Sequence, residues 1–223
     1  MNKACIKEIF TSIQGEGLYA GEMQIFVRFC SCNLNCKYCD TDFKKDKKSV
    51  SYTSETLAEK LIHKEVSTVS LTGGEPLLET KFLLEFLPLI RNHKKVYLET
   101  NGTLTNELAQ IIDYVDVVSA DIKLKSATKQ QNRFLINDEF MSVASKKECF
   151  IKVVFDEYIE KNEIEQVVKI AKKYDLPIVL QPMMRKNSFY IKPEKAFEIL
   201  KIFYKLYSNT RLIPQLHKFL EIL

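Results

Sequence analysis

CSCNLNCKYCDTDF, residues 30–43, holds four of the chain's six cysteines within its first ten residues and follows directly on an apolar run, IFVRF. Cys32, Cys36 and Cys39 have the spacing C-x3-C-x2-C, and Cys30 precedes them by two positions. A disulfide-linked loop, a zinc site or an iron–sulfur cluster would each explain such a concentration of thiols.

The bulk properties make the disulfide the least favoured of the three. The 223 residues suffice for one domain, and 46% apolar with 28% charged residues is typical of soluble globular proteins. The N-terminus, MNKACIKEIF, lacks the long apolar core of a signal peptide, and the most apolar stretch (82–90) is too short to span a bilayer. We therefore expect a cytoplasmic protein with no membrane partner, in which thiols stay reduced. The net charge of +4 gives little reason to expect nucleic acid.

Strand and helix patterns alternate along the chain. Apolar, β-branched runs predict strands at 25–29, 66–72, 95–99, 115–120, 149–155 and 177–181. Helical periodicity is present at 54–65, with Ser54 as the expected cap, and at 80–92, 106–114, 163–174 and 193–208. No clear strand precedes GEGLYAG (15–21). The alternation indicates parallel strands in a doubly wound sheet or an incomplete barrel. We expect the latter: one domain (1–223), an α/β fold with an incomplete, TIM-like (β/α)6 barrel of mainly parallel strands.

Unusual residues follow most of the predicted strands. The cysteine loop follows the first strand, GGEP (73–76) the second, TNGT (100–103) the third, DIK (121–123) the fourth and PMM (182–184) the sixth. Glycine, asparagine and proline also form ordinary turns. However, ligand sites of such folds lie at the carboxyl ends of the strands, so we expect these segments to gather on one rim.

The spacing of the thiols favours an iron–sulfur cluster over zinc. Structural zinc sites use four ligands, usually in two separated pairs, and no second C-x-x-C or H-x-x-x-H follows. Cys30 is a possible fourth ligand, but we interpret it as a packing residue. Three thiolates on one loop hold three irons of a [4Fe–4S] cluster and leave the fourth iron open. Cys5 and Cys149 are isolated and are expected to be small buried residues.

The cysteine motif, with Tyr38 before its last cysteine, resembles the signature of the radical S-adenosylmethionine (radical SAM) enzymes, and GGEP resembles their glycine-rich motif. The resemblance implies that the open iron chelates the amino and carboxylate groups of SAM. Reduction then cleaves SAM to a 5′-deoxyadenosyl radical, which abstracts a hydrogen atom from the substrate, while the protein orients the reactants and excludes water.

Residues 9–43, IFTSIQGEGLYAGEMQIFVRFCSCNLNCKYCDTDF, and PQLHKFL (214–220) resemble the 7-carboxy-7-deazaguanine synthases. The resemblance implies a ring contraction of 6-carboxy-5,6,7,8-tetrahydropterin to 7-carboxy-7-deazaguanine with release of ammonia, which serves the biosynthesis of queuosine and other 7-deazapurines. It also implies magnesium, regeneration of SAM, a homodimer, and a reducing partner such as flavodoxin or ferredoxin.

The resemblance also implies roles for individual residues. The cluster ligands are Cys32, Cys36 and Cys39, and Thr41 matches the magnesium position. The positions that match SAM contacts are Tyr38, Cys39, Asp40, Gly74, Glu75, Ser119, Asp121, Lys123 and Gln181. Those that match substrate contacts are Ile13, Gln14, Gly15, Glu16, Gly17, Arg28, Thr72 and His217. The guanidinium of Arg28 suits the substrate carboxylate, because it donates two parallel hydrogen bonds.

The chain departs from the family at two places. Ser-Ala-Asp-Ile-Lys (119–123) replaces the usual Ser-Pro-Lys, which leaves open whether Asp121 or Lys123 makes the contact, and Cys30 replaces a non-cysteine residue. The nearest alternative function is that of an activating enzyme, which generates a glycyl radical on a partner protein. A non-catalytic zinc-binding module is the alternative from another class.

Overall fold

The computed structural model describes residues 2–39, 46–185 and 188–222. Its centre is a nine-stranded sheet in the order β11-β8-β7-β6-β5-β4-β2-β1-β3. The strands are β1 (Lys3–Ile13), β2 (Met23–Phe29), β3 (Val50–Thr53), β4 (Thr68–Gly73), β5 (Lys95–Thr100), β6 (Val117–Asp121), β7 (Glu148–Phe155), β8 (Ile178–Pro182) and β11 (Thr210–Leu212). A separate hairpin pairs β9 (Met184–Arg185) with β10 (Ser188–Phe189).

The sheet is mostly parallel and stays open, which confirms the expected incomplete barrel. Every neighbouring pair from β11 through to β2 is parallel, and only β1 pairs antiparallel, with β2 and with β3. The six predicted strands are present with boundaries shifted by at most two residues. The prediction that no strand precedes residues 15–21 was wrong, because β1 ends at Ile13.

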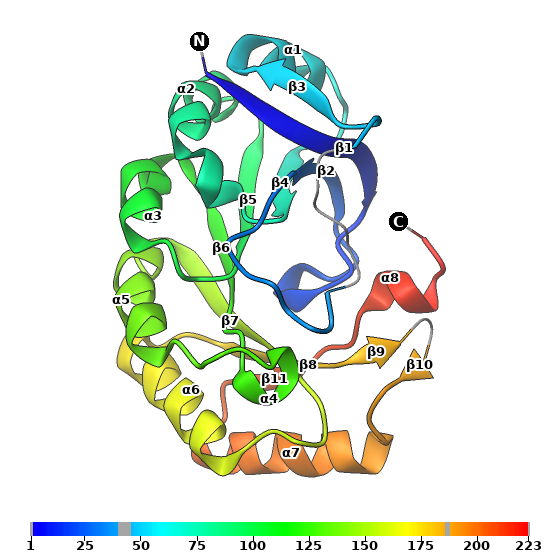
Figure 1. The fold of residues 1–223 in the computed structure, drawn as a ribbon, viewed down its shortest axis with the longest axis vertical. Helices are drawn as coiled ribbons and strands as arrows, with labels where there is room; N and C mark the ends of the chain where they lie inside the picture. The colour runs from blue at the N-terminus through cyan, green and yellow to red at the C-terminus, as the bar shows by residue number, and fades with distance from the viewer. Residues whose placement is uncertain (1, 40–45, 186–187, 223) are drawn as a thin grey trace.

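The helices are α1 (Ser54–Ile62), α2 (Thr80–Ile90), α3 (Thr105–Ile111), α4 (Lys125–Thr128), α5 (Phe134–Ala144), α6 (Lys161–Tyr174), α7 (Pro193–Leu206) and α8 (Leu216–Phe219). Short 3-10 turns lie at Gly17–Tyr19, Pro76–Glu79 and Ile112–Tyr114. Figure 1 shows α2, α3, α5 and α6 in a row on one side of the sheet, and α8 on the other. The cap of α1 is Thr53, which accepts from the Thr56 amide (3.3 Å), and the predicted cap Ser54 is the first helical residue. None of the described helices is long and apolar enough to cross a membrane.

The two faces of the sheet carry different side chains, because successive residues of a strand point to opposite faces. Toward the helices, Leu98, Val118 and Ile151 belong to the main buried core. Toward the other face, Tyr97, Val117, Phe150 and Val179 form a second, small apolar cluster. Two residues further along each strand, on that same face, lie Glu99, Ser119, Lys152 and Gln181. The pleat thus places polar groups at the carboxyl ends of the strands, above an apolar floor.

Candidate active site

The cysteine loop begins where β2 ends and packs on the turn after β4. Ser31 has a positive φ of 70°, and Cys30 is buried, as expected of a packing residue. The amide of Gly74 donates to the carbonyl of Phe29 (3.1 Å), and the amide of Glu75 donates to that of Ser31 (2.9 Å). A Cβ on Gly74 would lie 1.6 Å from the Ser31 oxygen, so glycine is needed for this close approach of the two turns.

The three cysteines of the motif line a cavity of about 1130 Å³ at the carboxyl ends of β4, β5 and β6. Burial raises the pKa of the Cys36 thiol to about 11, so a cationic partner is needed to stabilise its thiolate. In the described chain these thiols do not form the close three-ligand group that a single metal ion needs. Three thiols that line one cavity suit a group of several irons, each of which takes one thiolate. The donor set therefore fits a [4Fe–4S] cluster.

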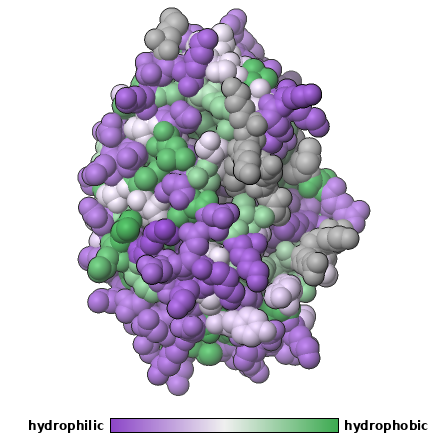
Figure 2. Space-filling model, viewed as in Figure 1, coloured by the Kyte–Doolittle hydropathy of each residue, from purple (hydrophilic) through white to green (hydrophobic). Residues whose placement is uncertain are grey.

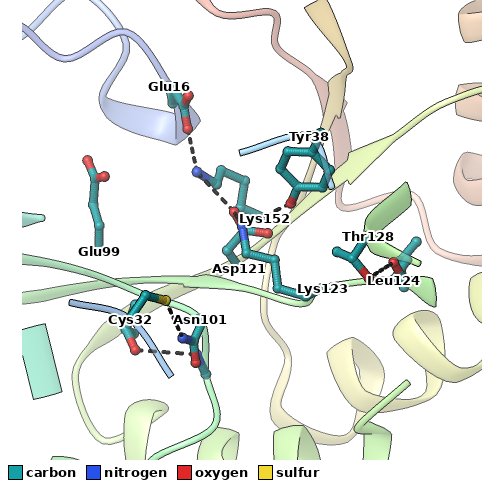
Figure 3. A network of polar contacts seen from close by, with 12 residues as sticks. Glu16, Cys32, Tyr38, Glu99, Asn101, Asp121, Lys123, Leu124, Thr128 and Lys152 are labelled. Carbon is teal, nitrogen blue, oxygen red and sulfur yellow. Dashed lines mark hydrogen bonds and ion pairs between the residues drawn. The ribbon is translucent and has the colours of Figure 1, made fainter. Parts of the chain in front are cut away.

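Asp121 is the centre of a network of buried charges (Figure 3). Its Oδ2 accepts from the amines of Lys123 (2.7 Å) and Lys152 (3.2 Å). Lys152 also pairs with Glu16, and Lys123 donates to the Tyr38 hydroxyl (2.9 Å). Burial has the largest single effect and lowers the pKa of Lys123, but Asp121 and Tyr38 together raise it above its usual value, so the amine stays protonated. Asp121 Oδ1 is buried with no hydrogen-bond partner among the described residues, so a donor on a bound ligand would satisfy it.

A second cavity of about 480 Å³ adjoins the first. The residues that line both are Tyr38, Cys39, Thr72, Gly73, Glu99, Asp121, Lys123 and Lys152. The two cavities therefore adjoin as one space, with Cys32 and Cys36 at one end and Gln14, Arg28 and His217 at the other, and Cys39 lies in the shared lining. The rim expected from the strand ends is confirmed, since the segments after β2, β4, β5, β6 and β8 all contribute to this space.

Glu99 lies in the lining that the two cavities share. Its Oε1 accepts from Gln14 Nε2 (2.7 Å), and its Oε2 accepts from the hydroxyl of Thr72 (2.7 Å). Arg28 lies in the second cavity, where its Nε pairs with Glu8 (2.9 Å). Carboxylate, amide and guanidinium groups thus face the same space, which suits a flat ligand that carries both hydrogen-bond donors and a negative charge.

The C-terminal helix closes the other side of the second cavity. The ring of His217 packs on Gly15, where an added Cβ would lie 1.9 Å from Nδ1. Gln215 donates from Nε2 to Glu16 Oε1 (2.6 Å). Burial raises the pKa of the Glu16 carboxyl, but the opposing effects of Lys152, Gln215 and His217 prevail and lower it to about 2. Segments from both ends of the described chain therefore meet at this cavity.

Most of the residues selected from the sequence line the combined space. In the first cavity are Cys32, Cys36, Gly74 and Ser119, in both are Tyr38, Cys39, Thr72, Asp121 and Lys123, and in the second are Ile13, Gln14, Gly15, Glu16, Arg28, Gln181 and His217. Gln181, selected as a SAM contact, thus lies on the side of the expected substrate residues. Asp40 and Thr41 lie outside the described residues.

Two selected residues line neither cavity. Gly17, with a φ of 69°, packs against Phe150. Glu75 is fully buried and accepts hydrogen bonds from the Asn101 amide (2.8 Å), the Thr100 hydroxyl (2.9 Å) and the Leu77 amide (3.2 Å). Its side chain therefore holds the turns after β4 and β5 together.

Sequence reasoning missed Glu99, Lys152 and Gln215. Lys152 interrupts the apolar run CFIKVVF, and a lysine in a buried strand signals a paired, special environment. Glu99 ends KVYLE one residue before the TNG turn, so the rim argument applied to it as well. For Gln215 the sequence holds no signal of its own, because its partner Glu16 is 199 residues away.

Comparisons with known proteins agree with this geometry. The sequence profile of the radical SAM superfamily matches residues 26–187. The 7-carboxy-7-deazaguanine synthase of Geobacter sulfurreducens is 35% identical and is aligned over 96% of each chain. That of Archaeoglobus fulgidus is 32% identical over 99% of each. Among solved structures, QueE from Escherichia coli superposes with a TM-score of 0.67 over 96% of this chain and 95% of its own, at 22% identity, which supports the fold.

Proposed function

The chain belongs to the radical SAM superfamily and to the family of the 7-carboxy-7-deazaguanine synthases, and we propose that it converts 6-carboxy-5,6,7,8-tetrahydropterin to 7-carboxy-7-deazaguanine with release of ammonia, in the biosynthesis of queuosine and other 7-deazapurines. The observation that carries this proposal is the adjoining space with Cys32 and Cys36 at one end and Gln14, Arg28 and His217 at the other. In this superfamily a [4Fe–4S] cluster and SAM supply a 5′-deoxyadenosyl radical that abstracts a hydrogen atom.

On the cofactor side, Cys32, Cys36 and Cys39 would bind the cluster. The orphan oxygen of Asp121 supports a role as hydrogen-bond acceptor for SAM, and Lys123 holds that carboxylate in place. Gly74 and Ser119 line the same cavity. Glu75 would act indirectly, since it fixes the turn that presents Gly74.

On the substrate side, Arg28 would bind the pterin carboxylate. Its guanidinium is a planar fork of five donors that suits a carboxylate, and its Nε pairs with Glu8. Gln14, Thr72 and His217 would orient the heterocycle. We add Glu99 to this set, because its carboxylate is held by three side-chain donors and suits ring and amino N–H groups. The shared wall would keep the reacting atoms close and exclude water.

Further parts of the proposal rest on the family resemblance. They are Mg²⁺ at Thr41, contact of Asp40 with SAM, a homodimer, and a protein electron donor such as flavodoxin or ferredoxin. A cytoplasmic location is supported by the clustered thiols, which stay reduced there. We also propose that residues 1–223 act as a single radical SAM domain.

An anaerobic assay tests the function. Protein reconstituted with iron and sulfide receives dithionite, SAM, Mg²⁺ and 6-carboxytetrahydropterin, and mass spectrometry follows the product. We expect 7-carboxy-7-deazaguanine with the wild type and none with Cys36→Ala. Cleavage of SAM with intact pterin would refute the substrate and favour the activating enzyme. Zinc in place of iron, without cleavage of SAM, would refute the whole class.

A further inference from the structure

The side chain of Asn101 lies between the cysteine loop and the turn that follows β5. Its Nδ2 donates to Asn33 Oδ1 (2.8 Å) and also contacts the sulfur of Cys32 (3.9 Å). Figure 3 shows this sulfur facing the amide of Asn101. Asn101 lines the first cavity together with the thiols, but it is neither a cluster ligand nor one of the residues assigned to SAM or to the pterin.

Asn101 belongs to a closed ring of three side-chain hydrogen bonds. Asn33 Nδ2 donates to the hydroxyl of Thr103 (2.9 Å), and that hydroxyl donates to Asn101 Oδ1 (2.5 Å). The bond from Asn101 Nδ2 to Asn33 Oδ1 closes the ring. The ring therefore occupies the oxygen and one N–H of the Asn101 amide, and the second N–H of Nδ2 is the one available to the Cys32 sulfur.

Neighbouring elements hold the backbone that carries this ring. The backbone amide of Asn101 donates to Glu75 (2.8 Å), and Asn137 of α5 donates to the carbonyl of Gly102 (2.8 Å). Gly102 has a φ of 65°, which glycine adopts without strain. Asn101 itself is only 5% exposed. Its side-chain amide is therefore held in one orientation, and water competes little for its N–H groups.

A thiolate at Cys32 selects the direction in which the ring runs. If both amides were turned over, the three ring bonds would run the other way, and Asn101 would direct its oxygen at the sulfur. A metal-bound thiolate only accepts hydrogen bonds, so it favours the direction in which Asn101 presents N–H. A protonated Cys32 donates instead to Asn33 Oδ1 (3.9 Å). The backbone amide of Leu34 also donates to this sulfur (3.4 Å), so two N–H groups converge on it.

We propose that Asn101 is a positioning residue that makes the cluster easier to reduce, because it holds an N–H on the sulfur of Cys32. The inference rests on the proposed function only in that the motif thiolates hold a [4Fe–4S] cluster. One electron from a chemical reductant converts [4Fe–4S]2+ to [4Fe–4S]+, and no proton moves, since Asn101 keeps its N–H. A donor at a ligand sulfur stabilises the added negative charge and so raises the reduction potential.

Potentiometric titration of the reconstituted protein with dithionite, followed by electron paramagnetic resonance, tests the proposal without SAM or pterin. In Asn101→Ala we expect one-electron reduction to become about threefold less favourable, which is a fall in potential of ~28 mV. Asn101→Asp keeps the size of the side chain and the acceptor for Thr103, but it replaces the N–H groups with a negative oxygen. Its potential should therefore fall further than that of the alanine variant.

Asn35 provides the matched control, because it lies in the same loop and lines the same cavity. The amide of Lys37 joins this loop to α4 at the carbonyl of Thr128 (3.2 Å), and Figure 2 shows hydrophilic side chains over the part of this face where α4 lies. Asn35 is exposed, so water hydrates its amide. Asn35→Ala should therefore keep the wild-type potential, and Asn35→Asp should shift it less than Asn101→Asp does.

A purely structural role of Asn101 predicts a different result. Asn101→Ala would then lose iron to a chelator faster than the wild type, while its remaining cluster kept the wild-type potential, and this would overturn the proposal. Equal shifts in the Asn101 and Asn35 variants would overturn it as well. If Asn101→Ala binds too little iron to titrate, Thr103→Val decides, since it keeps the shape of Thr103 but removes the hydroxyl that orients the amide. Its potential should also fall, and a wild-type value would count against the proposal.

The same samples distinguish this proposal from the proposed function. A wild-type protein that assembles no [4Fe–4S] cluster would refute both. The expected order of potentials, together with absence of 7-carboxy-7-deazaguanine in the anaerobic assay, would refute the proposed function alone and support the role of Asn101.

Discussion

At the scale of single residues, Lys152 is the side chain whose removal should disturb the site most. It joins Glu16, in the loop after β1, to Asp121 at the end of β6 (3.2 Å to Asp121). Lys152→Met leaves both buried carboxylates without this partner, and we expect a loss of about 3–5 kcal/mol in the free energy of unfolding. Urea denaturation measures it, and Lys152→Arg should retain more stability than the methionine variant.

The exposed pair of Lys173 with Asp138 (2.7 Å) provides the control for Lys152. Because solvent screens that pair, Lys173→Met should cost less than about 1 kcal/mol. Equal losses in the two methionine variants would show that the buried network contributes no more than a surface ion pair.

Glu75 should make stability depend on pH. Burial raises the pKa of its carboxyl to about 7, against the lowering effect of its three hydrogen-bond donors. Between the unfolded value, about 4.5, and about 7, the folded state keeps a proton that the unfolded state has released. The free energy of unfolding should therefore fall as pH rises through this window, by up to about 3 kcal/mol, and level off above it.

Glu75→Gln removes that titration, so its stability should change less between pH 5 and 8 than that of the wild type. Urea denaturation of both proteins across this range measures the difference, with Glu59→Gln, on the exposed side of α1, as the control. Parallel profiles for Glu75→Gln and the wild type would show that burial of Glu75 does not determine its titration.

At the scale of elements, the contact between the loop after β1 and α8 should control access of substrate. An added Cβ at Gly15 would lie 1.9 Å from His217 Nδ1 and 2.6 Å from Cγ, so Gly15→Ala should displace the ring or the whole of α8. We expect KM for the pterin to rise by about tenfold or more, with kcat less affected, since a contact made equally in the ground state and the transition state affects KM alone. The double variant Gly15→Ala/His217→Ala lacks the ring atoms that would clash with the added Cβ. A Gly15→Ala enzyme with unchanged KM would separate α8 from substrate binding.

How well the sequence predicts a helix or a strand depends on how that element is buried. The strands β4 to β8 are buried on both faces and read as continuous apolar runs, so they were predicted within two residues. β1 was missed because only Ala4 and Ile6 among its eleven residues are buried, which leaves no apolar pattern. α5 was missed as well: Leu135 and Ile136 are exposed, which blurs its helical period.

At the scale of the whole molecule, the site combines a local motif with pairings that no local pattern encodes. The cysteine loop and the GGEP turn are contiguous and were recognisable. The partners of Glu16 are Lys152 and Gln215, 136 and 199 residues away. The register of the parallel sheet places Glu99 beside Ser119, and the loops after β1 and β11 place Glu16 and Gln215 together. Glu99 and Lys152 carried signals in the sequence, whereas Gln215 became visible as a site residue only in the folded chain.

The site and the main core occupy different parts of the molecule, and this predicts how the protein responds to loss of its iron. The main core lies between the sheet and its helices and contains none of the motif cysteines, which are half-buried or exposed. Removal of iron by an anaerobic chelator should therefore leave the far-ultraviolet circular dichroism and the cooperative unfolding of the chain nearly unchanged. Loss of either signal would mean that the cluster is required for folding.

Two variants with the same chemical change, cysteine to serine, test that prediction more directly. In the metal-free protein, Cys36→Ser should change the free energy of unfolding by less than about 0.5 kcal/mol, because its side chain lines an open cavity. Cys149→Ser places a hydroxyl in the main core, where we expect a loss of about 1–3 kcal/mol unless it finds a hydrogen-bond partner. If Cys36→Ser were the more damaging of the two without metal, the cysteine loop would be part of what holds the sheet together, rather than a site built on an independently stable fold.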